Sequence, residues 1–349
     1  MCKSSFQSCP GEVLWNDNVV LKVNPTDYDL HDETLTVEVK EGKNSLKFKG
    51  KGKSDKLGLS IDNVRLVREG TTEDIVINGD FEMPQVAGTY EIFNKIPGWE
   101  GKEMEIGPSS TYSEEWPATQ VAELDGNFNT DMTQHFTFDA ELKLVRVISR
   151  LSFLWASRTT HNINSRRGEV VWNDAVVARL IPSNTQIQQA AFDVELKNGD
   201  NEIQLKGFNR YGMIVDKVSL ESTYDDTDLV VNGDFEHPRA PVNRMTVLKN
   251  SFKGWQTKRG EIGDCRYWNS QWTRFGHNQC IHLSTTNPLY EQKIKVEDAK
   301  YKELLKKQRA QEDSEPKKCT KENCDERKKL ELTFQWACRT STALKSCEV

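Results

Sequence analysis

The sequence predicts an all-β protein of two antiparallel jelly-roll β-sandwiches, one intact and one split between the chain's two ends, with one short inserted helix. Three observations predict this. Apolar and polar residues alternate in short runs separated by Gly, Asn and Asp turns, which is typical of sandwiches. Most of the chain occurs twice. One charged segment has no second copy and has helical periodicity. The 349 residues are also enough for two domains of roughly 150 residues each.

The repeat is visible as short motifs in a fixed order. INGDFE at residues 77–82 matches VNGDFE at 231–236, and each is followed by a GW pair and an EIG triplet. LSFLWASRT at 151–159 matches LTFQWACRT at 332–340. The remaining motifs, GEVVWNDAVV at 168–177 and VDKVSL at 215–220, match GEVLWNDNVV at 11–20 and IDNVRL at 61–66. The two ends of the chain therefore supply complementary parts of one copy.

We interpret residues 74–221 as an intact domain and residues 8–68 plus 228–347 as a split domain. The links Val67–Asp74 and Glu221–Asp228 would then run side by side between them. The split domain could close within one chain, or between neighbouring copies. Closure between copies gives a head-to-tail contact, and hence a filament unless rotation closes a ring. A third possibility is that the chain is cut from a longer tandem array, because any two-repeat window contains matching halves.

Taken in order, the individual elements read mainly as strands. The segments 37–50 and 194–207 each alternate apolar and polar residues around a turn, at Glu41–Asn44 and at Asn198–Gly199. This pattern predicts two β-hairpins. The apolar segment 144–157 predicts one long buried strand or two shorter ones.

The unrepeated segment 297–329 predicts a charged helical insertion. Within it, Tyr301, Leu304 and Leu305 lie on one stripe of a helix over Glu297–Asp313, and Pro316 ends that helix. A charged loop follows. Such a helix is either solvated decoration or a surface that binds a partner.

All eight cysteines fall in the split copy, and an even number confined to one domain suggests a disulfide set in an oxidising compartment. The candidates are Cys2, Cys9, Cys265, Cys280, Cys319, Cys324, Cys338 and Cys347. Bridges from Cys2, Cys9 or Cys347 could join the two ends of the chain. The alternatives are a zinc site at Cys319 and Cys324, or reduced thiols.

Composition narrows the classes of function. The net charge of −6, with both signs mixed throughout, disfavours nucleic-acid binding. No apolar run approaches the roughly 20 residues of a membrane span. The first residues contain no apolar segment typical of a signal peptide, which conflicts with the disulfide interpretation. The sequence has no HExxH, GxSxG or P-loop motif, so we do not expect an enzyme.

The ordered motifs NGDFE, GW, EIG, VAELDGN (121–127), LSFLWASR, VVWND and VDKV or IDNV resemble those of the galactose-binding-like jelly rolls. That family includes calcium-containing carbohydrate-binding modules and related secreted surface proteins. The resemblance covers both copies, apart from residues 297–329. In the split copy, QCIHLST (279–285) replaces VAELDGN and lacks its acidic pair. The resemblance implies eight-stranded antiparallel sandwiches whose first and last strands are adjacent.

The same resemblance implies a structural calcium between the first and last strands. The matching residues are Glu82 with Asp216 in the intact copy, and Glu236 with Asp62 in the split copy. Calcium prefers six to eight oxygen ligands from carboxylates and carbonyls, which suits these side chains.

Nine tryptophans divide into two groups. Six recur in both copies, which predicts that they are core residues: Trp15, Trp99, Trp155, Trp172, Trp255 and Trp336. Trp116, Trp268 and Trp272, beside Tyr112 and Tyr267, lie in the variable loop after EIG. We expect these loop aromatics to be exposed, because loops on a rigid scaffold commonly carry binding residues and sugars stack on aromatic rings.

These observations favour a structural, self-assembling protein of the cell surface or extracellular space, whose main partner is another copy of itself. The alternative is a monomeric, calcium-stabilised module that binds glycans.

Overall fold

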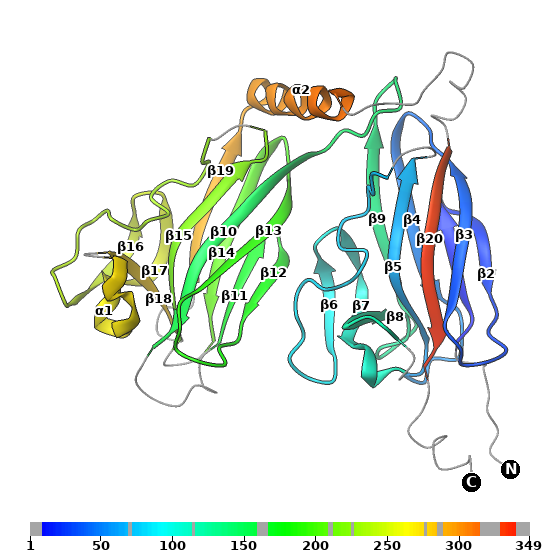
Figure 1. Ribbon diagram of the computed structural model, residues 1–349, viewed down its shortest axis with the longest axis horizontal. Helices are drawn as coiled ribbons and strands as arrows, with labels where there is room; N and C mark the ends of the chain where they lie inside the picture. The colour runs from blue at the N-terminus through cyan, green and yellow to red at the C-terminus, as the bar shows by residue number, and fades with distance from the viewer. Residues whose placement is uncertain are drawn as a thin grey trace, which may run out of the picture. The chain divides into compact units, whose positions relative to one another are not determined.

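The computed structural model describes residues 9–68, 72–113, 116–158, 167–208, 212–224, 227–275, 278–284, 289–314 and 329–339. Within these residues the chain forms twenty strands and two α-helices, and nearly all strand pairs are antiparallel neighbours in two large sheets (Figure 1). The all-β prediction with one short inserted helix is confirmed.

The chain divides into two compact units at positions that differ from the predicted boundaries. Unit 1 comprises residues 1–145 and 316–349, and unit 2 comprises residues 146–315. The predicted intact domain, 74–221, is therefore shared between both units. The predicted split domain is only partly right, because residues 329–338 do join residues 11–68, whereas the strands between 245 and 296 belong to unit 2.

The links explain the difference. After β5 (Leu59–Arg68), the chain folds back onto that strand: the Leu66 amide donates to the Asp74 carboxylate at 3.0 Å, and the Val64 amide donates to the Gly79 carbonyl at 2.9 Å. Unit 2 repeats this after its equivalent strand, where Leu220 binds Asp228 at 3.0 Å. Each half-copy therefore packs against the half that follows it.

Unit 1 contains ten strands in the sheet order β2-β1-β4-β9-β7-β8-β5-β20-β3, with β6 paired to β7. Besides β5, they are β1 (Gly11–Trp15), β2 (Asn18–Val23), β3 (His31–Glu38), β4 (Gly42–Gly50), β6 (Glu91–Ile96), β7 (Trp99–Pro108), β8 (Gln120–Glu123), β9 (Asp131–Phe138) and β20 (Lys329–Cys338). A short 3-10 helix, η2 (Ser109–Thr111), follows β7.

Unit 2 has the same topology, in the order β12-β11-β14-β19-β17-β18-β15-β10-β13, with β16 paired to β17. Its elements are β10 (Val147–Ser157), β11 (Gly168–Trp172), β12 (Ala175–Leu180), β13 (Gln188–Leu196), β14 (Gly199–Gly207), β15 (Met213–Ser222), β16 (Met245–Phe252), β17 (Trp255–Asp264), α1 (Cys265–Trp268), η4 (Ser270–Phe275), β18 (Gln279–Leu283), β19 (Leu289–Val296) and α2 (Asp298–Ser314). In this correspondence β20 occupies the position in unit 1 that β10 occupies in unit 2.

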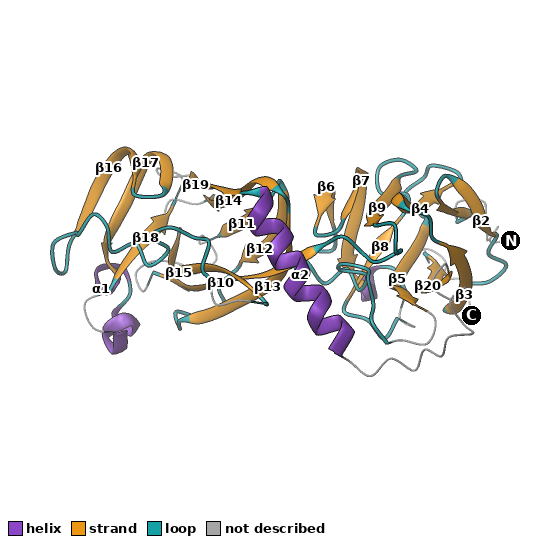
Figure 2. Ribbon diagram, turned by 90° about the horizontal axis from the view of Figure 1, so that it is seen from above, coloured by secondary structure: helices purple, strands orange, loops and turns teal. Residues whose placement is uncertain are grey.

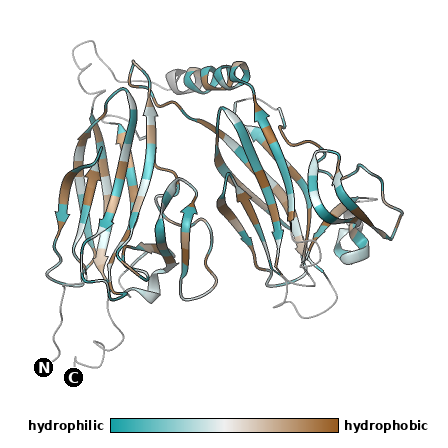
Figure 3. Cartoon of the chain, turned by 180° about the vertical axis from the view of Figure 1, so that it is seen from behind, coloured by the Kyte–Doolittle hydropathy of each residue, from teal (hydrophilic) through white to brown (hydrophobic). Residues whose placement is uncertain are grey.

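Each sheet folds over to enclose one core. In unit 1, β7 pairs with β8 through Glu105–Pro108 and with β9 through Glu100 and Gly101, so it connects the two layers. Buried side chains from both layers, such as Phe48 of β4 and Ile61 of β5, belong to one apolar cluster. Apolar and polar colours alternate along many strands (Figure 3), as the period-two pattern requires.

The predicted hairpins are wrong in their pairing, although their strands exist. β3 and β4 follow one another but do not pair: β3 pairs with β20, and β4 with β1 and β9. The buried Asn44 side chain satisfies the turn instead, accepting from the Lys40 amide at 3.1 Å and donating to the Lys40 carbonyl at 2.7 Å. Asn201 does the same in unit 2. The turn therefore leads from one layer to the other.

The predicted helix is present as α2 (Figure 2), and Leu304 is fully buried, with Tyr301 and Leu305 packed against the core of unit 2. The apolar stripe thus covers the sandwich of its own unit. Within the segment 144–157, residues Val147–Ser157 form one strand, β10. No helix among the described residues has the length and apolarity that a bilayer crossing requires.

The observed boundaries can be tested with fragments. Residues 146–314 should fold cooperatively on their own, because they contain all ten strands of unit 2 and α2. Residues 74–221 should not fold, because this fragment separates β6–β9 from β1–β5 and β10–β15 from β16–β19. Thermal melts followed by circular dichroism distinguish the two. A cooperative melt for 74–221 alone would restore the boundaries that the repeats suggested.

Candidate functional site: the closing strand and its charged anchor

The two units differ in how they obtain one strand of the sheet. In unit 1 this strand is β20, which we call the closing strand. It lies between β5 and β3 and is antiparallel to both, from Leu330 opposite Arg68 to Cys338 opposite Leu59 on one side (Figure 1). On the other side it pairs with the whole length of β3. Among the described strands, β3 pairs only with β20. Removing the closing strand would therefore detach β3 as well.

The inner face of the closing strand completes the core of unit 1. Its four apolar side chains are buried: Leu330, Leu332, Phe334 and Trp336. Phe334 meets Phe48 edge to face, with ring centroids 5.1 Å apart. Burying each such side chain contributes about 1.5–3 kcal/mol, or about 6–12 kcal/mol together. Because a whole domain is stable by only about 5–15 kcal/mol, unit 1 without this strand should not be stable.

Polar contacts hold the closing strand in register with β3. The Trp336 indole donates to the Glu33 carboxylate at 3.2 Å, and the Gln335 amide donates to Asp32 at 2.9 Å. The imidazole of His31 stacks on Trp336 with centroids 4.2 Å apart. A slip of one residue would reverse the faces of the strand and lose all three contacts.

Two disulfides lie among the described residues, and one of them fastens the closing strand. Cys338, its last residue, is bonded to Cys9, 329 residues away in sequence. In unit 2 the equivalent of Cys338 is Ser157, so this bond has no counterpart there. The second disulfide joins Cys265 to Cys280 in unit 2. The other four candidates, Cys2, Cys319, Cys324 and Cys347, lie outside the described residues.

A buried charged cluster lies directly beyond the closing strand. We call Glu105, Tyr112, Glu123 and Arg339 the anchor cluster. Arg339 forms an ion pair with Glu105 at 3.1 Å and a second with Glu123, and its guanidinium lies 4.8 Å from the centre of the Tyr112 ring. The Tyr112 hydroxyl donates to Glu105 at 3.0 Å. One arginine thus binds side chains from β7 and β8 and the loop between them.

Two carboxylates facing one cation leave the anchor cluster dependent on Arg339. Both glutamates are almost completely buried. Burial raises the pKa of Glu123 well above its ordinary value, while the positive charge of Arg339 opposes this shift. Removing the arginine would leave two buried acids without their cation, a change that typically costs about 3–5 kcal/mol.

The acidic pair of VAELDGN serves this end of the sandwich. Glu123 accepts from the Gly58 amide at 2.6 Å. Asp125 is fully buried and accepts from the amides of Asp55 and Lys56 at 2.8 and 2.9 Å. The Lys56 carbonyl in turn accepts from Arg339 at 3.2 Å. The acidic pair therefore orders the loop that receives the arginine.

Unit 2 has a different charge pattern at the same place. His282 replaces Glu123, and its Nδ1 lies 2.7 Å from the carboxylate of Glu261, the counterpart of Glu105. Trp268 stacks on His282 with centroids 5.5 Å apart. Of the two units, only unit 1 therefore offers two buried carboxylates to the arginine that follows the closing strand.

The carboxylates expected to bind calcium are paired differently from the prediction. Asp62 has Asp80 and Glu82 as charged neighbours, whereas Asp216 has Glu236. The predicted pairs, Glu82 with Asp216 and Glu236 with Asp62, are wrong because each unit is built from consecutive halves of the chain. Asp62 and Asp216 occupy equivalent positions, since Asp62 lies on the strand next to β20 and Asp216 lies on the strand next to β10.

In unit 1 the donor atoms near Asp62 are oxygens. Asp62 is buried, and its Oδ1 has no hydrogen-bond partner; the same is true of the Ser60 hydroxyl. Glu82 accepts hydrogen bonds from the Gln120 amide at 3.0 Å and from the Thr119 hydroxyl. Burial, and then the charges of Asp80 and Glu82, raise the pKa of Asp62 to about 8. An acidic, incompletely hydrogen-bonded set of oxygens suits a hard cation.

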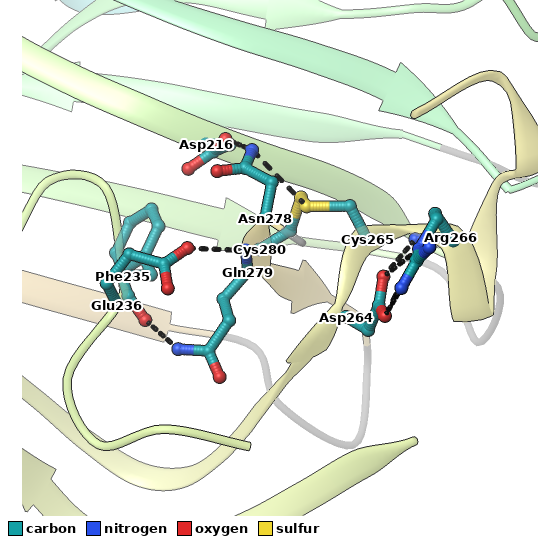
Figure 4. The surroundings of a disulfide bond; sticks show 9 residues. All are labelled: Asp216, Phe235, Glu236, Asp264, Cys265, Arg266, Asn278, Gln279 and Cys280. Atoms are coloured by element: carbon teal, nitrogen blue, oxygen red, sulfur yellow. Dashed lines mark hydrogen bonds and ion pairs between the residues drawn. A yellow bond between two sulfur atoms is a disulfide. The ribbon is translucent and has the colours of Figure 1, made fainter. Parts of the chain in front are cut away.

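In unit 2 the surroundings of Asp216 are softer. The sulfurs of Cys265 and Cys280 and a carboxylate oxygen of Asp216 all lie within 4.8 Å of one another (Figure 4). Asn278 donates to Asp216 Oδ2, while Oδ1 has no hydrogen-bond partner. Sulfur is a poor calcium ligand. The two sulfurs beside Asp216 therefore offer calcium no ligands.

The predicted sugar platform is wrong. Trp116, Trp268 and Trp272 are 6%, 2% and 0% exposed, as buried as the six recurring tryptophans, and Tyr112 is 1% exposed. Trp268 and Trp272 pack around the second disulfide, and Trp116 and Tyr112 pack against Val121 and Ala337. The variable loops fold over the sandwich ends. Of the five residues, only Tyr267 is exposed, at 49%.

Sequence reasoning missed Arg339 and its two glutamates. A signal was present: an arginine follows the WAS or WAC motif in both copies, and an acidic residue interrupts the apolar strand at Glu123. No family model, curated protein or solved structure matches the chain. The functional argument therefore depends on the geometry of the site.

The anchor cluster can be tested by replacing its cation. Arg339→Met should destabilise unit 1 by about 3–5 kcal/mol, because two buried carboxylates lose their partner. Urea unfolding measures this. The control is Arg150→Met, which removes a half-exposed ion pair with Asp193 and should change stability by no more than about 1 kcal/mol. Equal effects of the two substitutions would contradict a special role for Arg339.

The buried aspartates predict an unusual pH dependence in chelator-treated protein. Burial raises the pKa of Asp62 to about 8 and of Asp216 to about 7, from 3.8. The folded state then binds more protons than the unfolded state above about pH 4, so this contribution to stability is complete below that pH and is lost as pH rises towards 8. Melting temperatures of the wild type and of D62N/D216N across this range measure it. Parallel curves would contradict the prediction.

Proposed function

We propose that this protein is a structural, self-assembling protein whose closing strand can complete unit 1 of a neighbouring copy. The observation that carries the proposal is the place of β20. In unit 2 the equivalent strand, β10, leads directly into the rest of its sandwich. In unit 1 the corresponding strand, β20, comes after the whole of unit 2 in the sequence.

This topology separates the strand from the fold that it completes. Residues 139–145, the whole of unit 2 and then residues 316–328 lie between β9 and β20 in sequence. The strand contacts, the disulfide and the anchor cluster are the same whether β20 comes from its own chain or from another copy. Exchange of an identical element between copies is a low-cost route to assembly, and the physics of strand insertion is that of donor-strand complementation.

Closure within the chain is the arrangement described above, and the covalent connection between the two parts favours it through a high local concentration. Closure between copies becomes competitive at high protein concentration, or where a partner unit 1 is open during folding. An open unit 1 exposes core and strand edges, so it should be filled by one donor or the other. The two disulfides suit an oxidising compartment such as the cell surface.

Complementary cysteine variants test the exchange. C9S and C338S chains are co-expressed in a background where Cys2, Cys319, Cys324 and Cys347 are serine. Neither chain can form the Cys9–Cys338 bond alone. Strand exchange predicts a disulfide-linked dimer on non-reducing gels, with a Cys9–Cys338 peptide by mass spectrometry. Monomers alone, with both thiols free, would contradict exchange. The control is the chain that carries the same four serines but keeps both Cys9 and Cys338, and mass spectrometry should find the Cys9–Cys338 bond in it.

We also propose that unit 1 is stabilised by calcium held by Asp62, Asp80 and Glu82. The support is the buried Asp62 Oδ1, which has no hydrogen-bond partner, and the repulsion between Asp62 and the two acids Asp80 and Glu82. When bound, calcium would neutralise that repulsion beside the closing strand, since Asp62 lies opposite Gln335 of β20. The buried tryptophans give no comparable support to glycan binding.

Calcium should raise the melting temperature of unit 1, and a chelator should lower it. D62N should abolish this difference, because it removes a buried anionic ligand. D216N is the matched control in unit 2 and should leave the calcium effect intact. Differential scanning calorimetry with and without calcium measures both. A calcium effect lost in D216N and retained in D62N would contradict the assignment.

A further inference from the structure

We propose that, when its disulfide is reduced, unit 2 binds a zinc ion through Cys265, Cys280 and Asp216. These three residues are the only group of His, Cys, Asp or Glu side chains among the described residues whose ligand atoms lie within 4.8 Å of one another. All three are buried. Two thiolates and a carboxylate are ligands that zinc accepts.

The backbone brings these ligands together from three elements. Asp216 lies on β15, Cys280 lies on β18, and Cys265 begins α1 directly after β17. β18 pairs with both neighbours, since Ile281 lies opposite Val215 of β15 and Cys280 lies opposite Gly263 of β17. The positions are therefore set by sheet register, and breaking the sulfur–sulfur bond would not scatter them.

A disulfide does not require polar neighbours, yet a buried carboxylate and an amide lie beside this one. Asp216 is fully buried, yet its Oδ1 has no hydrogen-bond partner. The Asn278 amide donates to Asp216 Oδ2 and lies 3.8 Å from the Cys265 sulfur (Figure 4). A half-turn of this amide would present its carbonyl oxygen to the same space. Asn278 or a water molecule could thus complete a four-coordinate site.

The geometry needs only a small adjustment. Ligand atoms around a tetrahedral zinc are about 3.5–3.8 Å apart, given Zn–S and Zn–O distances of about 2.3 and 2.1 Å. Sulfurs in a disulfide are about 2 Å apart. After reduction, the distance between the two sulfurs would need to increase by less than about 2 Å to reach the zinc geometry.

The thiols are specific to unit 2. At the equivalent positions unit 1 has Ser109 and Val121, in the same sheet register, because Val121 lies opposite Gly107 as Cys280 lies opposite Gly263. The fold therefore does not require a cross-link here. Asp62, the counterpart of Asp216, has carboxylates as neighbours rather than sulfurs. Unit 2 combines a buried acid with a thiol pair, and unit 1 does not.

Two molecules of an external thiol reduce the disulfide, giving two cysteine thiols and one external disulfide. A zinc ion then displaces one proton from each thiol and binds the two thiolates and the Asp216 carboxylate. Unit 2 would therefore keep α1 linked to β18 in oxidising and in reducing surroundings, and the zinc would add β15 to that link.

Cobalt serves as the spectroscopic probe for the zinc site. The full chain, with Cys2, Cys319, Cys324 and Cys347 replaced by serine, is reduced, freed of metal and titrated with Co²⁺. We expect a thiolate-to-cobalt charge-transfer band at one equivalent, which Zn²⁺ then removes. The oxidised protein should give no band. Reduced protein should melt at a higher temperature with Zn²⁺ than without it.

Variants identify the ligands. C265S and C280V introduce the residues that unit 1 already has, so they suit the fold, and each should abolish the band. D216N should weaken cobalt binding by at least about tenfold, since losing a ligand costs no less than losing an outer-shell partner. Formation of the Cys265–Cys280 bond in oxidised D216N confirms that unit 2 is folded. C9S/C338S, which removes the other thiol pair, should leave the band unchanged. Absence of the band from the reduced protein, or a band unchanged in C265S, C280V or folded D216N, would overturn the proposal.

Discussion

A sandwich is stable only when every strand that covers its core is in place, and in unit 1 one of these strands follows the whole of unit 2 in the sequence. The closing strand buries four apolar side chains, provides the only described partner of β3 and ends at a disulfide, directly before a half-buried arginine. The core, the edge and the charged end of unit 1 therefore all depend on one insertion. The self-assembly proposal follows from this constraint.

The two units share a topology and differ where chemistry is possible. Unit 1 has three acids around the Asp62 position, where we propose calcium, and two more that pair with Arg339 beyond the closing strand. Unit 2 has a histidine in place of Glu123 and a thiol pair beside Asp216. An arginine follows the equivalent strand in both units, but only in unit 1 does it meet two buried glutamates, since unit 2 has His282 at the position of Glu123. Duplication has preserved the scaffold, while substitutions at the sandwich ends have given each unit its own requirements.

The sequence was sufficient for the fold class, the repeat, the inserted helix and most strands, because periods of two and 3.6 residues are local properties. The pairing of strands was harder to predict from the sequence, because it depends on contacts between distant residues. A repeated sequence can be divided into domains at any equivalent pair of positions, and the division is decided by contacts such as Leu66 with Asp74. The two supposed hairpins failed for a similar reason, since one buried Asn44 side chain turns the chain between layers.

The site residues show the same limit. The sequence identified four acidic candidates, and the structure places each of them near another acid, but the sequence paired them according to the wrong domain boundaries. They are Asp62, Glu82, Asp216 and Glu236. The loop tryptophans were expected to be exposed because their positions vary between the copies. Variation does not imply exposure: Trp268 and Trp272 fill the space around a disulfide that unit 1 lacks. Arg339 was missed because a single conserved-looking charge after a strand gives no indication of buried acids far away in sequence.

The dependence of unit 1 on the closing strand can be measured directly by supplying the strand separately. A chain ending at residue 314 should contain a folded unit 2 and an open unit 1. A labelled peptide of residues 329–339 should bind it with one-to-one stoichiometry and restore the second melting transition, and the same peptide with R339M should bind more weakly. A chain ending at residue 314 that already melts with both transitions, and does not bind the peptide, would contradict the account.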